Sequence, residues 1–282
     1  MTKNQKFREL INRDEPLILP AAHDVLSAKI IENAGFEALT TSGFGIAASL
    51  LGMPDVGLLT MLEMVSVLKN MANATSVPIL ADGDEGFGNE RNVARTVREF
   101  ENAGVSGINI EDQVFPKQCG HTQGKQVISE EDFVLKIKTA VDSRSDQDFV
   151  ILARIDSRAI NGIEDALHRA RECVKVGADI IFIEAPQSVE ELKLIGKSIK
   201  EKPLLVNMLE GGKTPHLSQQ DLFKMGFKIM VFPLTSILAT HFTLTKVMAN
   251  LQKDQSIKSF KNQLTGFGDF KKFIDFPKEG ET

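Results

Sequence analysis

The sequence predicts an α/β fold, a single (β/α)8 TIM barrel that spans residues 1–282 and carries a C-terminal helical extension at about 234–275. Short runs rich in Ile, Val and Leu alternate with longer amphipathic segments, a pattern typical of repeated strand–helix units around a parallel sheet. Eight such runs occur, as this barrel requires. Polar and ionisable residues follow the runs directly, at the edge where barrel enzymes place their active sites. An open, doubly wound sheet is the alternative fold.

The expected strands follow in chain order from these apolar runs. They cover residues 17–22, 36–41, 77–82, 105–112, 149–156, 178–185, 203–208 and 227–233. The segments between them have the spacing of amphipathic helices, and several end at a glycine that suits a left-handed C-terminal cap. These glycines are Gly35, Gly104, Gly177 and Gly226. The repeated unit is therefore a helix, a glycine and a strand.

The segment after the last strand is longer than the closure of a barrel requires. The residues that follow Pro233 have a helical pattern, and a further helix is expected at 256–273. Such a tail commonly packs on a neighbouring subunit. The sequence therefore indicates an oligomer.

Composition and charge exclude several classes of protein. The formal net charge is −5 and there is no dense run of Lys and Arg, so neither nucleic acid nor an anionic membrane is an expected partner. No apolar run reaches the roughly 18 residues of a membrane span, and the N-terminus lacks the apolar core of a signal peptide. Cys119 and Cys173 give no disulfide framework, so we expect a cytoplasmic protein that acts on a small molecule.

Two carboxylates follow the third expected strand. Asp82 and Asp84 are separated by one glycine in ADGDEGFG, and Asp55 and Glu111 could add further oxygen ligands. Mg²⁺ prefers oxygen ligands, keeps several waters and needs few protein groups, so this pair is a candidate metal platform. An ordinary Asp-Gly turn is equally compatible with the spacing.

The loop after the fourth expected strand carries a cysteine in EDQVFPKQCGHTQGK. Cys119 lies between Lys117 and His121, whose positive charge would favour a thiolate, and it could act as a nucleophile or a proton carrier. A small buried cysteine is the alternative, but Pro116 and Gly120 favour an exposed loop. Cys173, within a helical pattern, is expected to be packed in the core.

Arg154 is the other charged residue of interest, because it ends the apolar run FVILARID. A guanidinium at the end of such a strand is expected to face an anion, and its planar fork suits a carboxylate. The sequence therefore predicts an anion-binding arginine at the same edge as the acidic residues.

These segments carry a family resemblance over nearly the whole chain. The motifs are SGFGIAASLLGMPD, LADGDEGFG, EDQ followed by KQCGH, ARIDSR, FIEAP and NMLEGGKTP. With them the chain resembles the isocitrate lyase and phosphoenolpyruvate mutase superfamily, and within it the short-chain lyases. The resemblance implies a (β/α)8 barrel whose eighth helix is often exchanged between subunits, hence a homotetramer built as a dimer of dimers, or a homodimer.

The resemblance also implies roles for individual residues. Mg²⁺, or alternatively Mn²⁺, would bind at Asp82 and Asp84, with Asp55 and Glu111 in the outer shell. Cys119 would be the general acid that protonates the carbanion, with Lys117 and His121 beside it. The residues expected to contact the substrate carboxylates and the second product are Ser42, Gly43, Phe44, Asp55, Arg154, Gly120, His121, Glu184, Asn207 and Glu210.

Departures from the family pattern narrow the expected substrate. Thr40 stands where methylisocitrate lyases carry a tyrosine, Leu209 where they carry a threonine, and Leu238 where they carry an arginine for a third carboxylate. Pro233 replaces a serine of oxaloacetate acetylhydrolase, and KQCGH differs from the loop of the phosphonate mutases. The missing tyrosine leaves the base for the substrate hydroxyl open between a metal-bound water and a carboxylate.

The sequence therefore predicts a Mg²⁺-dependent carbon–carbon lyase. Its expected substrate is a small 2-hydroxy dicarboxylate, a 2-alkylmalate such as 2,3-dimethylmalate, cleaved to a 2-oxo acid such as pyruvate and a short carboxylate. The alternatives are methylisocitrate cleavage to pyruvate and succinate, hydrolysis of oxaloacetate, and a catalytically silent barrel that binds a 2-oxo acid.

Overall fold

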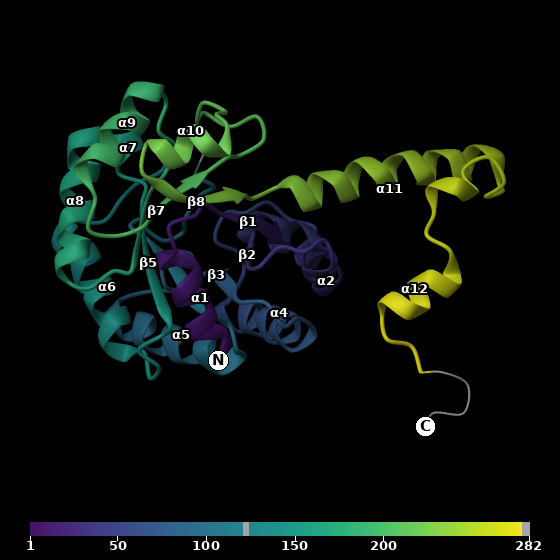
Figure 1. Ribbon diagram of the computed structural model, residues 1–282, viewed down its shortest axis with the longest axis horizontal. Coiled ribbons are helices and arrows are strands. Elements are labelled where there is room, and N and C mark those ends of the chain that lie inside the picture. The colour runs from purple at the N-terminus through teal and green to yellow at the C-terminus, as the bar shows by residue number, and fades with distance from the viewer. Residues whose placement is uncertain (121–123, 278–282) are drawn as a thin grey trace. The chain divides into compact units, whose positions relative to one another are not determined.

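Eight parallel strands close into a barrel in the computed structural model, which describes residues 1–120 and 124–277 (Figure 1). Each strand pairs with the next along the chain, and β8 pairs with β1 through Leu17–Ile229 and the three following positions. The strands are β1 (Leu17–Ala22), β2 (Leu39–Thr41), β3 (Ile79–Asp82), β4 (Gly107–Glu111), β5 (Val150–Ile155), β6 (Ile180–Ile183), β7 (Leu204–Asn207) and β8 (Phe227–Phe232). The predicted (β/α)8 barrel is confirmed, and the open sheet is excluded.

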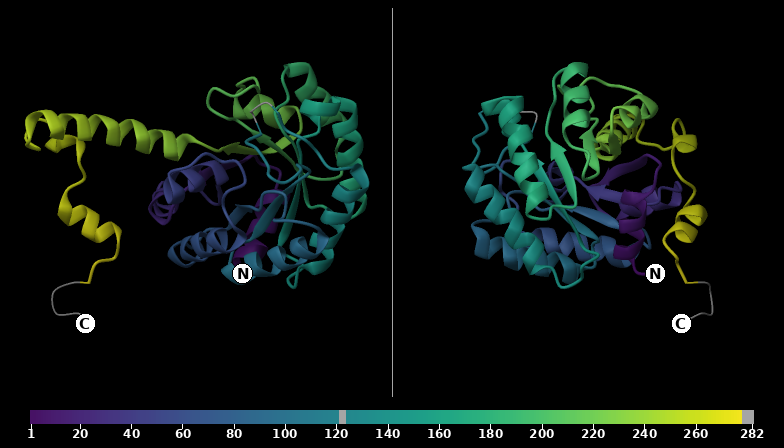
Figure 2. Two further views of the ribbon diagram at one scale, coloured as in Figure 1. Left: turned by 180° about the vertical axis from the view of Figure 1, so that it is seen from behind. Right: turned by 60° about the vertical axis from the view of Figure 1, so that its left-hand side comes forward.

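Most of the helices up to residue 224 lie around the outside of the strands, as the two further views in Figure 2 also show. The helices are α1 (Lys3–Asn12), α2 (Val25–Asn33), α3 (Gly43–Ile46), α4 (Met61–Ala74), α5 (Glu90–Ala103), α6 (Glu130–Ser143), α7 (Arg158–Asn161), α8 (Ile163–Lys175), α9 (Val189–Ser198), α10 (Gln219–Lys224), α11 (Thr235–Asp254) and α12 (Phe267–Phe273). A π-helical turn at Ala47–Leu51 follows α3, and a 3-10 turn covers Lys261–Gln263.

Local signals in the sequence explain where many of these helices begin and end. Thr60 caps α4 and Asn89 caps α5 with side-chain oxygens that accept backbone N–H groups of the first turn, which otherwise have no partner. Gly104 ends α5 with a φ of 88°, in the left-handed region. The other three glycines predicted as caps also have positive φ.

Except for β1, which matches the predicted run 17–22, the strands are shorter than the apolar runs that predicted them. The run at 36–41 pairs with its neighbours only from Leu39 onward, and the run at 178–185 forms a strand only over Ile180–Ile183. Ala185 has a φ of 55°, which is incompatible with an extended strand. The apolar runs therefore extend past the strand ends into the turns that follow or precede them.

The interior of the barrel is a packed core and not a channel. Side chains from six strands meet there with Phe7, Leu10 and Ile11 of α1, all buried. Arg8 of α1 donates to the carbonyls of Gln147, Asp148 and Phe149, just before β5. Helix α1 therefore covers the amino end of the barrel, and the carboxyl end remains available for a site.

The chain divides into two compact units, residues 1–237 and residues 238–282. The first contains all eight strands, and the second contains most of α11 together with α12. Within residues 1–120 and 124–277, no helix combines the length and apolar character of a membrane-crossing segment.

Candidate active site

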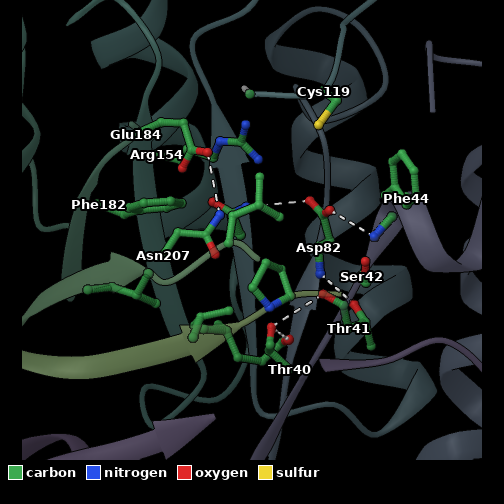
Figure 3. A pocket seen from close by; sticks show the side chains of 18 of the residues that line it. Thr40, Thr41, Ser42, Phe44, Asp82, Cys119, Arg154, Phe182, Glu184 and Asn207 are labelled. Atoms are coloured by element: carbon green, nitrogen blue, oxygen red, sulfur yellow. Dashed lines mark hydrogen bonds between the residues drawn. The ribbon is translucent and has the colours of Figure 1, made fainter. Parts of the chain in front are cut away.

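A pocket opens at the carboxyl ends of the strands, where the sequence placed the candidate site. Its walls come from strand ends and the loops that follow them, including Asp82 after β3, Arg154 in β5 and Asn207 at the end of β7. Figure 3 shows Cys119 on one side of this pocket and Thr40 on the opposite side. Residues more than 160 positions apart in the chain therefore share one small space.

Asp82 is held by backbone and side-chain donors around its carboxylate. Its Oδ2 accepts from the Gly43 N–H at 3.2 Å, and its Oδ1 lies 3.4 Å from the Asn109 amide nitrogen. The Asp82 N–H donates to the Thr41 hydroxyl at 2.9 Å. A Cβ on Gly43 would lie only 2.7 Å from Asp82 Oδ2, so glycine allows the loop after β2 to approach this carboxylate.

Lys117 brings two more carboxylates into the same cluster. Its Nζ lies 2.5 Å from Asp55 Oδ1 and 2.7 Å from Asp84 Oδ1, and its side chain is only 3% exposed. Burial by itself would lower the pKa of Lys117, but Asp84, Asp82 and Asp55 raise it well above its usual range. Burial raises the pKa of Asp84 to about 7, against the opposing effect of Lys117. The ammonium that the sequence placed beside Cys119 is thus paired with carboxylates.

Arg154 forms the floor on the other side, and Glu111 is buried beneath it. Arg154 Nη1 lies 3.1 Å from Glu111 Oε2, and its Nε donates to Asp156 Oδ2 at 2.8 Å. Burial would lower the pKa of Arg154, whereas Asp156 and Glu111 raise it well above its usual range. Burial also raises the pKa of Glu111, which Arg154 opposes. Arg154 therefore faces carboxylates of the protein itself, as well as the pocket.

The predicted substrate-binding residues occupy distinct positions around the pocket. Ser42 caps α3 by accepting from the Gly45 N–H at 3.1 Å, and Phe44 lines the wall beside it. Asn207 donates to Glu184 Oε1 at 3.4 Å, and both line the pocket. Glu210, by contrast, is not among the described residues that line the pocket, and its carboxylate accepts from Thr235.

The loop with Cys119 lies directly against this floor. Cys119 lines the pocket with its sulfur directed inward (Figure 3), and a Cβ on Gly120 would lie 2.4 Å from Arg154 Nη2 and 2.6 Å from Glu184 Oε1. Neither Cys119 nor Cys173 forms a disulfide, and Cys173 is fully buried as predicted. His121, predicted beside the thiol, lies outside the described residues.

The carboxylate cluster fits a hard divalent cation. Asp55 and Asp82 line the pocket, whereas Asp84 and Glu111 are buried behind that lining. Lys117 pairs with Asp55 and Asp84, and Arg154 pairs with Glu111. Apart from its ion pair with Arg154, Glu111 has no side-chain hydrogen-bond partner among the described residues. No three acidic, His or Cys groups of the described chain converge on one point. Mg²⁺ needs only one or two carboxylates with waters in the remaining positions, so this donor set suits it.

Several residues of the site were not among the sequence predictions. Asn109 and Thr41 support Asp82, and Gln113, Lys125 and Asp156 contact or support the loop of Cys119. Asn109 gave one available signal, because it is a polar residue inside an apolar strand and lies opposite Asp82 in the β3–β4 register.

Comparison with known proteins assigns the chain to a family. The family model of phosphoenolpyruvate phosphomutase matches residues 7–252. The chain belongs to the phosphoenolpyruvate phosphomutase family. The superfamily resemblance inferred from the motifs is therefore confirmed.

Two curated relatives illustrate the similarity at the level of sequence. A 2,3-dimethylmalate lyase from Eubacterium barkeri is 43% identical over 278 residues, covering 99% of this chain and 96% of its own. A 2-methylisocitrate lyase from Aeropyrum pernix is 43% identical over 275 residues, covering 96% of this chain and 88% of its own.

Several solved structures are similar to this one over nearly the whole chain. A 2,3-dimethylmalate lyase superposes with a TM-score of 0.92 at 33% identity, covering 97% of this chain and 92% of its own. An oxaloacetate acetylhydrolase in complex with 3,3-difluorooxalacetate gives 0.92 at 30% identity, with coverage of 97% and 93%. A phosphonopyruvate hydrolase in complex with oxalate and Mg²⁺ gives 0.88 at 30% identity, with coverage of 98% and 95%.

Proposed function

We propose that this protein is a Mg²⁺-dependent carbon–carbon lyase that cleaves a 2-alkylmalate, such as 2,3-dimethylmalate, into a 2-oxo acid and a short carboxylate. The observation that carries the proposal is the position of the Cys119 thiol on the wall of a pocket that also holds Asp82 and Arg154. This arrangement offers a proton donor on one side and charge-stabilising groups on the other. Similarity to a 2,3-dimethylmalate lyase and a 2-methylisocitrate lyase supports the reaction class.

The metal would be held by Asp82 and Asp84, with Asp55 and Glu111 reached through water. When bound, it would supply Lewis-acid stabilisation of the oxygens of the 2-oxo acid half. Mn²⁺ has the same preference for oxygen ligands and could replace Mg²⁺.

The residues of the chain have separate tasks in the cleavage. The bond between the carbinol carbon and the neighbouring carbon breaks, and its electron pair stays on the carbon next to the departing carboxylate. The hydroxyl proton passes to one of the carboxylates around Lys117, and the Cys119 thiol delivers a proton to the carbanion. Arg154 supplies a fixed positive charge to the substrate carboxylate. The attraction between them strengthens as negative charge develops in the transition state.

The apolar part of the pocket favours an alkyl substituent over a third carboxylate. Leu209 and Pro233, two of the departures from the family pattern, line the pocket. So do further apolar side chains, namely Leu152, Phe182, Leu205, Val231 and Leu234. A carboxylate against this wall would lose its hydration without gaining a partner, which is costly.

Thr40 donates to the Leu80 carbonyl at 2.8 Å and so does not replace the missing tyrosine as a base. Leu238 lies in the second unit, and its effect on specificity stays a prediction.

Proton NMR of the purified protein with Mg²⁺ tests the proposal in three parallel tubes. Pyruvate and propionate from 2,3-dimethylmalate are expected. Succinate from 2-methylisocitrate would overturn the interpretation of the apolar wall, and acetate with oxalate from oxaloacetate would make the protein a hydrolase. Removal of divalent metal with EDTA should stop the reaction, and Mg²⁺ or Mn²⁺ should restore it.

A binding function without catalysis is the second candidate, favoured by the absence of a tyrosine at Thr40. In that case no tube would show turnover, yet oxalate would bind in a Mg²⁺-dependent manner. In either role, a reducing compartment such as the cytoplasm would keep Cys119 as a thiol.

A further inference from the structure

Cys119 lies between two backbone groups that buried side chains hold in place. On its amino side, Gln113 forms two hydrogen bonds with the backbone of Gln118. The amide nitrogen donates to the Gln118 carbonyl at 2.9 Å, and the Gln113 Oε1 accepts from the Gln118 N–H at 3.0 Å. On its carboxyl side, Lys125 Nζ donates to the Gly120 carbonyl at 2.5 Å. Both neighbours of the thiol-bearing residue are therefore fixed through their main-chain atoms.

The two holding residues are themselves firmly anchored. Gln113 is 1% exposed and forms an antiparallel bridge with Val127 at the base of the loop, next to the hydrogen bond from the Val114 N–H to the Gln126 carbonyl. Lys125 Nζ also lies 2.6 Å from Asp156 Oδ1, and its side chain is 2% exposed. A buried lysine and a buried glutamine without such partners would be unfavourable, so their positions are strongly determined.

Lys125 also connects the loop to the arginine of the pocket. Asp156 accepts from Lys125 through Oδ1 and from the Arg154 Nε through Oδ2. The backbone of Gly120 packs against Arg154 and Glu184, with no room for a Cβ. The position of the thiol relative to Arg154 is therefore set by a continuous chain of contacts through Asp156.

We propose that Gln113 and Lys125 are positioning residues that hold the Cys119 thiol over the pocket for proton delivery. The inference rests on the proposed lyase function and assigns roles to two residues that do not line the pocket. A displacement of about 1 Å at a proton donor can reduce a rate by roughly a hundredfold, so positioning of this kind has a measurable effect.

Gln113→Leu is the first variant, because it removes both hydrogen bonds to Gln118 while keeping a side chain of similar size. Gln126→Leu is its matched control, since Gln126 is in the same loop and its side chain is exposed. We expect kcat for the cleaved substrate to fall about 10- to 100-fold in Gln113→Leu, while KM and Mg²⁺-dependent oxalate affinity change less than about threefold. Gln126→Leu should leave all three unchanged.

Lys125→Met is the second variant, and Lys3→Met is its control. The Lys3 ammonium also donates to backbone carbonyls, those of Ala72 and Thr75, but does not line the pocket. The same fall in kcat is expected for Lys125→Met, and Lys3→Met should leave kcat unchanged. If either loop variant does not fold, as judged by thermal unfolding, Gln113→Asn and Lys125→Gln replace them.

Alkylation of Cys119 by iodoacetamide, followed by mass spectrometry, gives a readout that does not depend on turnover. Mg²⁺ with oxalate should protect Cys119 in the wild type, and this protection should be largely lost in the Gln113 and Lys125 variants. Cys173, which is fully buried, serves as the internal reference. Unchanged kcat and unchanged protection in both folded variants would overturn the inference, as would a loss of oxalate affinity that equals the loss of kcat. Absence of turnover in the wild type would instead refute the proposed function, and the protection experiment would still test the positioning.

Discussion

The Cys119 thiol faces a pocket whose described charged side chains include Asp55, paired with Lys117, and Arg154, paired with Glu111 and Asp156. Cys119→Ser replaces the proton donor with a much weaker acid of nearly the same size. Because a positioned acid typically contributes a factor of about 10² to 10⁴, kcat should fall by this amount. Rates from NMR check the effect, and calorimetry should show unchanged Mg²⁺-dependent oxalate binding. Turnover at the wild-type rate would remove Cys119 from the mechanism.

His23 offers a pH-dependent test of stability outside the carboxylate cluster. Burial lowers its pKa, against the opposing effect of Asp24, and its Nδ1 lies 2.9 Å from Ser236 Oγ. The unfolded chain therefore binds a proton more readily than the folded protein. The contribution of neutral His23 to the free energy of unfolding is fully present above the ordinary histidine pKa of about 6.5. This contribution is lost as the pH falls through the lower pKa of the folded state.

Urea unfolding at about pH 7.5 and about pH 5.5 measures this effect, with the two values bracketing the ordinary histidine pKa. The wild type should lose more free energy of unfolding between these values than His23→Gln, which cannot titrate. Equal losses in the two proteins would show that protonation of His23 does not contribute.

At the level of residues, the sequence predicted which residues belong to the site better than it predicted the contacts between them. Asp82 and Arg154 were predictable because they follow apolar runs, and such positions meet at one edge of a parallel barrel. The pairing of Lys117 with Asp55 and Asp84 was not predictable, since it depends on how two loops fold over the barrel. The contact between Gly120 and Arg154 likewise joins residues more than 30 positions apart, for which a single sequence has no periodic signal.

Helix α9 is packed against the turn before β8 through a glycine. A Cβ on Gly196 would lie 1.7 Å from the Met225 carbonyl oxygen, which belongs to the backbone and cannot rotate away. Gly196→Ala should therefore lower the free energy of unfolding by about 1–3 kcal/mol or more, because the helix must shift. Lys197→Ala, at an exposed position of the same helix, is the control and should have little effect. Urea denaturation measures the free energy of unfolding of both variants. Equal urea midpoints for Gly196→Ala and Lys197→Ala would refute the predicted clash.

The elements themselves were more predictable than their limits. All eight strands arise from the predicted apolar runs, because alternation of apolar runs and amphipathic helices reflects the two sides of a parallel sheet. The short helices α3 and α7 and the π-helical turn at Ala47–Leu51 were not predicted. They are only four or five residues long, too short to show the 3.6-residue periodicity that reveals longer helices.

The second unit, residues 238–282, presents apolar side chains that the chain itself leaves exposed. Leu244, Met248 and Leu251 are spaced as one helix face of α11 and are between 37% and 52% exposed. We expect this face to be covered by another copy of the chain, in a homodimer or homotetramer. The exchange of the eighth helix between subunits remains a prediction.

Sedimentation velocity tests this assembly at micromolar concentration. A variant with Leu244→Asp and Met248→Asp should dissociate to smaller species, because burying two unpaired carboxylates at an apolar contact is costly. Gln252→Asp, at an exposed polar position of the same helix, should keep the wild-type mass. A monomeric wild type would contradict the expectation.

The pairing of β1 with β8 joins the beginning of the fold to its end. Residues 17–20 find their partners only at 229–232, more than 200 positions later. A ribosome emits the chain from its N-terminus, so β1 and the most recently released strand both keep unpaired edges until nearly the whole first unit has appeared. Such edges can recruit other strands, and the pairing of distant segments is slow. Any partial barrel that forms before residues 229–232 appear would therefore have two unpaired edges, and chaperone protection would be most valuable for such a species.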